Sequence, residues 1–338
     1  MKKYLIIITI LNLWIFSSFA YAQDIHFSKF FSAPLILNPA NTTNYHGNWS
    51  LISNYRTQGT KTEYSYITST VAFDFPVYIN KERAGLGFIW INDKSSDNSM
   101  SVNKMFISSA YFIKISHKSY LHMGLQAGYV NKRIDYSGIT FPDQFDMSIG
   151  YFNPDISTEE IMKNASLSYL DLNWGLIWSY KTPEFTSEIG MSMFHYNKPK
   201  ESFSSIDYRL NPRYVFHMFT EKAFLNNYFI KPKLIYVNQN KASELLIGFD
   251  TGLLFFDSKI SKNIYIGAFF RGGLNRNPDA FIVKTGFNYK NFDFAISYDI
   301  EIPGYEFYSY TKNAFELSIS YKRPETNIKN KTIPCTVF

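Results

Sequence analysis

Long stretches of the sequence alternate between apolar and polar residues. From Phe292 to Ile302 every even position carries a large apolar side chain, while the odd positions carry Asp, Ala, Ser or Glu. A similar alternation recurs from Leu170 to Lys181, from Leu121 to Tyr129 and from Phe315 to Lys322. Successive residues of a β-strand face opposite sides of the sheet, whereas a helix with this pattern would carry charges around its whole circumference. The chain is therefore predicted to be all-β.

Read in this way, the sequence contains about fourteen strands of roughly ten residues, the length of a tilted β-strand that crosses a lipid bilayer. An even number of strands is typical of single-chain bacterial outer-membrane barrels, so we predict a transmembrane antiparallel β-barrel. Pro232 interrupts one strand and predicts a bulge, because proline cannot donate a hydrogen bond to the ladder. The expected strands begin near Trp49, Thr62, Ala84, Asn103, Ser119, Leu170, Phe185, Pro212, Asn227, Ser243, Asn263, Asp279, Phe292 and Thr311.

The predicted connections between strands alternate in length. The longest runs from Asp135 to Tyr169 after the fifth strand, and the tightest runs from Ile115 to Ser119 after the fourth. Bacterial outer-membrane barrels have long outer loops and short periplasmic turns. The alternation therefore predicts a location in the bacterial outer membrane, with both chain ends in the periplasm.

Aromatic residues make up 19% of the chain and charged residues 18%, where soluble domains have roughly 25% charged residues. A lipid-facing barrel accounts for both values, because half of each strand meets hydrocarbon and its Tyr and Trp side chains meet the headgroups. A water-soluble β-sandwich is the alternative, although it offers no headgroup zone for these rings. A helical membrane protein would need several apolar runs of about 20 residues, and this sequence has one, at its N-terminus.

The N-terminal run has the layout of a secretory signal peptide. Lys2 and Lys3 precede an apolar stretch from Tyr4 to Phe16, and small residues allow cleavage near Ala22. An uncleaved anchor is the alternative, but the apolar stretch is short for a membrane-spanning helix. The predicted organisation is a signal peptide at 1–22, a periplasmic N-terminal segment at 23–48, the outer-membrane barrel at 49–322 and a periplasmic C-terminal tail at 323–338.

The sequence offers little for catalysis or metal binding. The six histidines include no pair at metal-ligand spacing, and the single cysteine, Cys335, excludes an internal disulfide and a cysteine-based zinc site. His195 and His217 are expected to lie close together near the outer ends of adjacent strands, with Ser192 and Glu188 nearby, which keeps an outer-membrane hydrolase as a third hypothesis. We predict no enzyme activity, no cofactor and no metal site.

Charged residues support neither an ion site nor nucleic-acid binding. Asp143, Asp146 and Asp155 cluster in the longest loop but lack the regular spacing of a calcium-binding loop. Loss of the two signal-peptide lysines lowers the net charge from +6 to +4, which is too mild to predict a nucleic-acid partner. Charges of both signs are expected inside the barrel, which indicates a wall of compensating charges. They are Lys114, Asp171, Glu188, Lys284, Asp293, Asp299 and Glu316.

Several short segments occur in an order and spacing found in one known family. They are Gln23 to Phe30, Asn38-Pro39-Ala40, Tyr55-Arg56, Gly124 to Tyr129, Ser297-Tyr298-Asp299, Phe315 to Tyr321, and a Cys-x-x-Phe ending at Cys335 and Phe338. Together they resemble the PorP/SprF family, the type IX secretion system outer-membrane proteins of Bacteroidetes. The run from Tyr55 to Gly59 lacks the tryptophan that members commonly carry, which leaves the paralogue group open.

This resemblance implies a non-enzymatic component of the type IX secretion system. Such a protein helps to export a secreted cargo, for example an adhesin used in gliding motility, and to hold it at the cell surface through its C-terminal signal domain. The implied partners are this cargo, periplasmic and outer-membrane secretion components, and outer-membrane lipids. A diffusion porin is the alternative. Candidate docking residues are Asp143, Asp146 and Asp155 in the outer loop, and Arg323, Cys335 and Phe338 in the tail.

Overall fold

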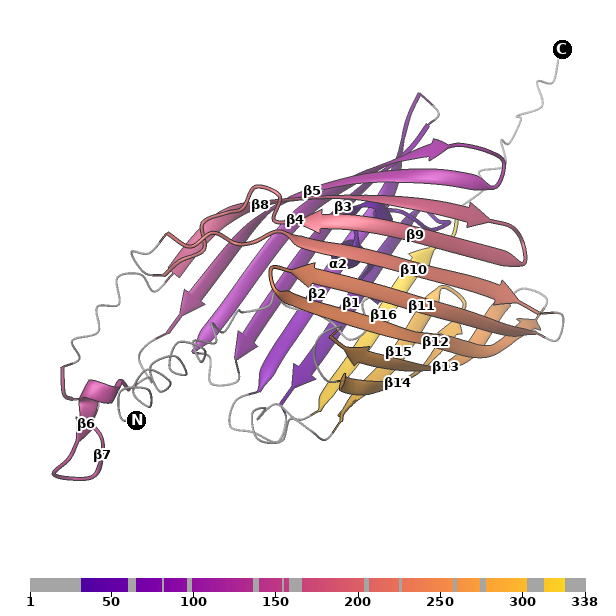
Figure 1. The fold of residues 1–338 in the computed structure, drawn as a ribbon. Helices are drawn as coiled ribbons and strands as arrows, with labels where there is room; N and C mark the ends of the chain where they lie inside the picture. The colour runs from indigo at the N-terminus through magenta and orange to yellow at the C-terminus, as the bar shows by residue number, and fades with distance from the viewer. Residues whose placement is uncertain are drawn as a thin grey trace, which may run out of the picture.

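The computed structural model describes residues 32–59, 65–80, 82–95, 99–135, 140–153, 155–157, 166–203, 207–224, 227–257, 260–273, 278–302 and 313–325. Fourteen antiparallel strands of this described part close into a barrel, the first strand pairing with the last (Figure 1). The predicted fold class is confirmed. The barrel strands are β1 (Trp49–Gln58), β2 (Tyr66–Ile79), β3 (Glu82–Ser95), β4 (Met100–Lys114), β5 (Ser119–Ile134), β8 (Ser166–Lys181), β9 (Phe185–Phe194), β10 (Arg213–Ala223), β11 (Tyr228–Gln239), β12 (Ala242–Asp257), β13 (Ile260–Gly272), β14 (Pro278–Tyr289), β15 (Phe292–Glu301) and β16 (Ala314–Arg323).

The barrel wall is apolar outside and mixed inside, as the alternation predicts. On β4, Ile107 is 68% exposed on the outer surface, while its neighbours Phe106 and Ser108 are buried. On β5, Leu125 is exposed on the outer surface and Gln126 is buried. Because adjacent strand residues point to opposite faces, one residue of each pair faces outward and the other faces the lumen.

The two ends of the barrel differ in their connections. One end, here called the short-turn end, carries the connections 80–81, 115–118, 182–184, 224–227, 258–259 and 290–291. The opposite, long-loop end carries 59–65, 96–99, 135–165, 195–212, 240–241, 273–277 and 302–313. The predicted alternation in length is confirmed, with exceptions at 96–99 and 240–241, which are as short as the turns of the other end. β1 begins and β16 ends at the short-turn end. The chain that precedes β1 therefore joins the barrel wall at this end.

Strand positions agree with the sequence pattern except at one proline. β1, β5, β9 and β15 begin at the predicted residues, and the other strands begin a few residues earlier or later. The bulge predicted at Pro232 is wrong, because β11 pairs with β12 through Pro232 without a change of register. The β10–β11 ladder is instead interrupted beside the proline, where Thr220 and Glu221 have no ladder partner on β11. A register shift occurs elsewhere, between Arg271 and Gly272 on β13.

Besides the barrel strands, the described residues form four smaller pieces of structure. The 135–165 connection contains η3 (Pro142–Gln144) and a hairpin of β6 (Phe145–Asp146) and β7 (Tyr151–Phe152), which lies well beyond the barrel at the lower left of Figure 1. Two short helices precede β1, α2 (Pro34–Leu37) and η2 (Pro39–Asn41). Among the described residues, no helix is long and apolar enough to cross a membrane.

Candidate functional site in the barrel lumen

The chain enters the barrel lumen before it forms its first strand. Residues 32–48, which we call the lumenal segment, contain α2 and η2, and Leu35, Asn38 and Ala40 are almost completely buried. The described part of the predicted periplasmic segment at 23–48 therefore lies inside the barrel. Apolar side chains and backbone groups of the segment find partners on the inner wall, which explains its position. Residues 23–31, also assigned to that segment, lie outside the described residues.

Prolines and an asparagine shape the lumenal segment. Pro34 and Pro39 stand in the first turns of the two helices, where the missing N–H costs no hydrogen bond. Between them, the Asn38 backbone N–H donates to the Pro34 carbonyl at 3.0 Å, and its side-chain oxygen accepts from the Ala40 N–H at 2.9 Å. Helices of one turn are unstable alone, so contacts with the wall must supply their stability.

Polar wall residues bind the backbone of the lumenal segment. Ser192 on β9 donates to the Leu37 carbonyl at 2.9 Å, and Gln126 on β5 donates to the Leu35 carbonyl at 3.3 Å. At the other end of the segment, Asp74 on β2 accepts from the Thr43 N–H at 2.6 Å. Further contacts are those of Thr42 with Ser108, of Asn44 with Glu188 and Lys181, and of Arg83 with the carbonyls of Thr43 and Tyr45. Most of these bonds recognise main-chain atoms.

Two glycines make room for the segment. Gly124 on β5 and Gly175 on β8 are direct partners in the ladder, so together they leave a bare patch on the inner wall. A Cβ at Gly124 would overlap the backbone of Pro39 and Ala40, and one at Gly175 would overlap the Asn38 side chain. The close approach of the segment therefore requires glycine at both positions.

Leu35 and Leu37 complete an apolar layer inside β3 to β5 and β8 to β14. Leu35 packs with Ile89, Ile91, Val102, Phe106, Val130 and Tyr169 on one side of the barrel. Leu37 packs with Phe194, Val215, Ile235, Leu246, Phe269 and Ile282 on the other. Because α2 joins the two clusters, we call this layer the septum. It lies between the long-loop end and the polar part of the lumen.

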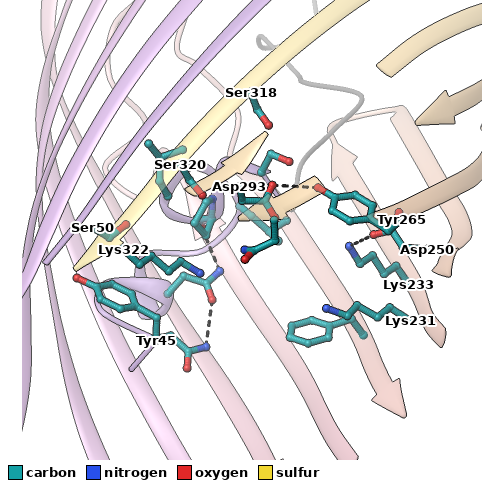
Figure 2. A pocket seen from close by; sticks show the side chains of 18 of the residues that line it. Tyr45, Ser50, Lys231, Lys233, Asp250, Tyr265, Asp293, Ser318, Ser320 and Lys322 are labelled. Carbon is teal, nitrogen blue, oxygen red and sulfur yellow. Dashed lines mark hydrogen bonds and ion pairs between the residues drawn. The ribbon is translucent and has the colours of Figure 1, made fainter. Parts of the chain in front are cut away.

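A polar cavity of about 390 Å³ adjoins the septum on the short-turn side (Figure 2). In it, Asp250 accepts hydrogen bonds from Lys233 at 2.6 Å and from Lys284 at 2.9 Å. The Tyr265 hydroxyl donates to Asp293 at 2.9 Å. Figure 2 shows Lys233 beside Asp250, and Tyr265 beside Asp293. Lysines and carboxylates neutralise one another here, so the lining favours polar contents without a strong preference for one sign of charge.

Tyr45, in the lumenal segment, also lines this cavity. Its hydroxyl donates to the Asp74 carbonyl oxygen at 2.8 Å, and Lys322 lies 5.7 Å from the centre of its ring. Burial raises the pKa of the Tyr45 phenol well above its usual value, and the Asp74 carboxylate adds to the increase. Tyr45 therefore remains a neutral hydrogen-bond donor.

A second buried network lies nearer the long-loop end. Arg56 on β1 pairs with Glu316 on β16, and its guanidinium lies 3.6 Å from Asp299 on β15. Asp299 is also 2.9 Å from Arg271 on β13. Charges of both signs therefore compensate one another across four strands.

Comparison with known proteins decides the family. Residues 19–321 match the family described as type IX secretion system membrane protein PorP/SprF. The chain belongs to the PorP/SprF family. Together with the barrel, this membership places the protein in the bacterial outer membrane as a membrane component of that secretion system. No curated protein matches the chain.

Solved structures with the same fold are outer-membrane channels. The toluene transporter TodX of Pseudomonas putida aligns with a TM-score of 0.54 and 9% identity, covering 87% of this chain and 93% of TodX. The monoaromatic hydrocarbon channel CymD aligns with a TM-score of 0.50 and 11% identity, covering 91% of this chain and 95% of CymD. At these identities the similarity concerns the fold alone.

Several of the described segments that resemble the PorP/SprF family meet inside the barrel. Asn38-Pro39-Ala40 lies on Gly124, and Gln126 from the same β5 segment bonds the Leu35 carbonyl. Arg56, Asp299 and Glu316, which come from three other segments, form the buried charge network. These residues of the resembling segments thus line the lumen rather than the outer loops.

The three aspartates proposed for docking lie on one small unit. Asp143 is in η3, Asp146 is in β6, and Asp155 follows β7. Hydrogen bonds from the Ser148 hydroxyl and N–H lower the pKa of the Asp146 carboxyl. Apolar side chains on the same unit are exposed, above all Met147 at 91% and Tyr151 at 60%. Among the described residues, no group of three His, Cys, Asp or Glu side chains is arranged to hold a metal ion.

The remaining docking candidates are placed differently or lie outside the described residues. Arg323 is the last residue of β16, where it pairs with Trp49 and its carbonyl accepts from the Asn48 N–H at 2.8 Å. It therefore belongs to the barrel wall and not to a free tail. Cys335, Phe338 and the cleavage position at Ala22 lie outside the described residues.

The two histidines considered for catalysis are not brought together. His217 lies opposite Gly190 within the ladder, whereas His195 follows the end of β9 and contacts Asp171 at 2.9 Å. The predicted proximity is wrong because His195 lies several ladder positions nearer the long-loop end. Ser192 and Glu188 contact the lumenal segment instead.

Most charges predicted inside the barrel lie there. Asp171, Glu188, Lys284, Asp299 and Glu316 are buried, and Asp293 is half-buried. Lys114 is instead exposed at the short-turn end of β4. The lumenal segment itself was missed, although two signals pointed to it: the Asn38-Pro39-Ala40 turn and the glycines at inward positions of neighbouring strands.

Proposed function

We propose that this protein is a closed, non-enzymatic outer-membrane subunit of the type IX secretion apparatus that assists a secreted protein rather than passing small solutes. The observation that carries the proposal is the lumenal segment, which joins the two apolar clusters of the septum. A diffusion channel needs a continuous path for water, and under this proposal the septum interrupts that path. A closed barrel is suited to hold partners at its two ends.

The proposed cargo is a surface protein with a C-terminal signal domain, such as an adhesin used in gliding motility. The surface proposed to meet it is the hairpin unit at the long-loop end, with exposed Met147, Ile149 and Tyr151 beside the three aspartates. Exposed apolar side chains of this kind are typical of interaction sites. The tail, residues 326–338, is the segment proposed to contact periplasmic components of the system.

Secretome comparison tests this function. A strain that lacks the gene is complemented with the wild type or with a hairpin variant, Met147→Ser/Ile149→Ser/Tyr151→Ser, and the secreted and surface proteins are quantified by mass spectrometry. We expect the wild type, but not the hairpin variant, to restore the missing cargo. Ile115→Ser, an exposed change in a short turn, is the matched control. A secretome unaffected by loss of the gene would refute the proposal.

Deletion of the tail tests its proposed contact with periplasmic components. Residues 326–338 are removed so that β16, which ends at Arg323, stays complete. We expect cargo export to be lost while the barrel still inserts into the outer membrane. Full secretion by the truncated protein would remove the tail from the proposal.

Conductance separates this function from that of a diffusion porin. The purified barrel is inserted into planar lipid bilayers, where a closed subunit gives no steady conductance. A large, steady conductance of the wild type would favour the porin.

A further inference from the structure

The bare patch on the inner wall has the properties of a peptide-binding site. Gly124 and Gly175 lie side by side under Asn38, Pro39 and Ala40, so a main chain can approach the wall without a side chain between them. Ser192 and Gln126 donate to carbonyls of the bound segment, and Asp74 accepts from one of its N–H groups. These contacts resemble those of a receptor with a peptide, because they are made to main-chain atoms.

Asn38 provides side-chain selectivity at this site. Its amide nitrogen donates to the carbonyls of Leu176 on β8 and Met191 on β9, each at 3.1 Å. Its oxygen accepts from the Ala40 N–H and so holds the turn. A residue without the amide would lose these three hydrogen bonds at a buried position, which is costly.

The barrel does not need the lumenal segment to close. β1 pairs with β2 on one side and with β16 on the other, so the wall is continuous without residues 32–48. The polar anchors of residues 34–43 lie on β2, β3, β4, β5, β8 and β9, whereas the 390 Å³ cavity borders the segment toward β11 to β15. The segment therefore borders empty space on the side away from these anchors.

We propose that the inner wall around Gly124 and Gly175 is a binding site for a short, uncharged peptide with a Leu-x-Leu-Asn-Pro-Ala sequence, and that residues 34–43 are its exchangeable occupant. Release of this occupant opens the septum, because Leu35 and Leu37 leave with it. The inference depends on the wall contacts alone and not on the secretion role.

The test measures ion conductance in planar bilayers and uses a synthetic peptide of residues 32–47. The barrel lacking residues 32–47 is expected to conduct steadily, where the full chain does not. Added peptide is expected to block this current in a concentration-dependent way. The same peptide with Asn38→Ala should need about tenfold or more higher concentration, because several hydrogen bonds are lost. A scrambled peptide is the matched control.

If the deletion variant does not fold, a second form of the protein still tests the proposal. A protease site is inserted between Tyr45 and Asn48, the full chain is folded, and the segment is then cut and washed out. Conductance should rise after cutting and fall when the peptide is returned. A folded barrel that stays closed without the segment would overturn the proposed opening of the septum. An open barrel that the peptide does not block would overturn the binding site.

Discussion

Arg56 on β1 and Glu316 on β16 face each other across the seam at which the first and last strands close the barrel. They are direct partners in the ladder, and their side chains form a buried ion pair. Asp299, 3.6 Å from Arg56, links the pair to Arg271. A buried charge that loses its partner is strongly destabilising, because it is neither solvated nor compensated. The seam therefore depends on a charge network as well as on its backbone ladder.

Loss of the seam carboxylate should weaken the whole barrel. We expect Glu316→Gln to lower the free energy of unfolding by about 3 kcal/mol, since the buried Arg56 guanidinium loses its paired carboxylate. Urea unfolding of the barrel in lipid vesicles, followed by tryptophan fluorescence, measures the change. The double variant Arg56→Gln/Glu316→Gln should lose less than the sum of the single variants. Strictly additive losses would argue against the pair.

Loss of a carboxylate should also destabilise the charge cluster in the polar cavity. Asp250 binds both Lys233 and Lys284, so Asp250→Asn leaves two buried ammonium groups without their shared carboxylate. We expect a loss of about 3 kcal/mol in the same urea experiment. The control is Asp207→Asn, which breaks an exposed pair with Lys200 and should change stability by less than about 1 kcal/mol. Equal effects of the two substitutions would contradict the buried network.

The wall could be predicted from the sequence because period-two alternation is a local signal. The pattern around Phe292 reports directly which side chains face lipid, and β15 begins at that residue. The pairing of Gly124 with Gly175 is different, because it depends on the register between two strands whose connection is the longest in the chain. The sequence shows the two inward glycines, but only the coordinates show that they lie side by side.

The lumenal segment escaped prediction for a related reason. Pro34 to Asn41 has no periodicity, and its two short helices gain their stability from contacts with strands more than a hundred residues away, such as that of Asn38 with Met191. The proximity of His195 and His217 was predicted wrongly because it depends on the register between β9 and β10. In that register His217 lies opposite Gly190, whereas His195 follows the end of β9. Local patterns thus predicted the barrel wall, whereas the position of the lumenal segment depends on tertiary contacts.

Truncation of a septum residue should cost stability. Leu37 is 2% exposed and packs against six side chains of the opposite wall, among them Phe194 and Leu246. We expect Leu37→Ala to lower the free energy of unfolding by about 2–4 kcal/mol, because it removes apolar contacts and leaves a void. Ile149→Ala, at an exposed position of the hairpin, is the control and should have little effect. A Leu37→Ala barrel as stable as the control would contradict the packed septum.

The hairpin beyond the long-loop end should depend on one ring contact. Phe145 and Phe152 meet edge to face with ring centroids 5.1 Å apart, and they are the only aromatic pair that the described hairpin residues form. A two-stranded hairpin is marginally stable, and such a ring pair contributes about 0.5–1.5 kcal/mol. Phe145→Ala should therefore open the hairpin and speed chymotrypsin cleavage near Tyr151 several-fold, while the barrel stays folded. Met147→Ala, which removes a side chain that is 91% exposed, should leave the cleavage rate unchanged. If both variants were cleaved at the wild-type rate, other contacts would have to hold the hairpin, such as the bond of Gln144 with the Ile156 carbonyl at 2.6 Å.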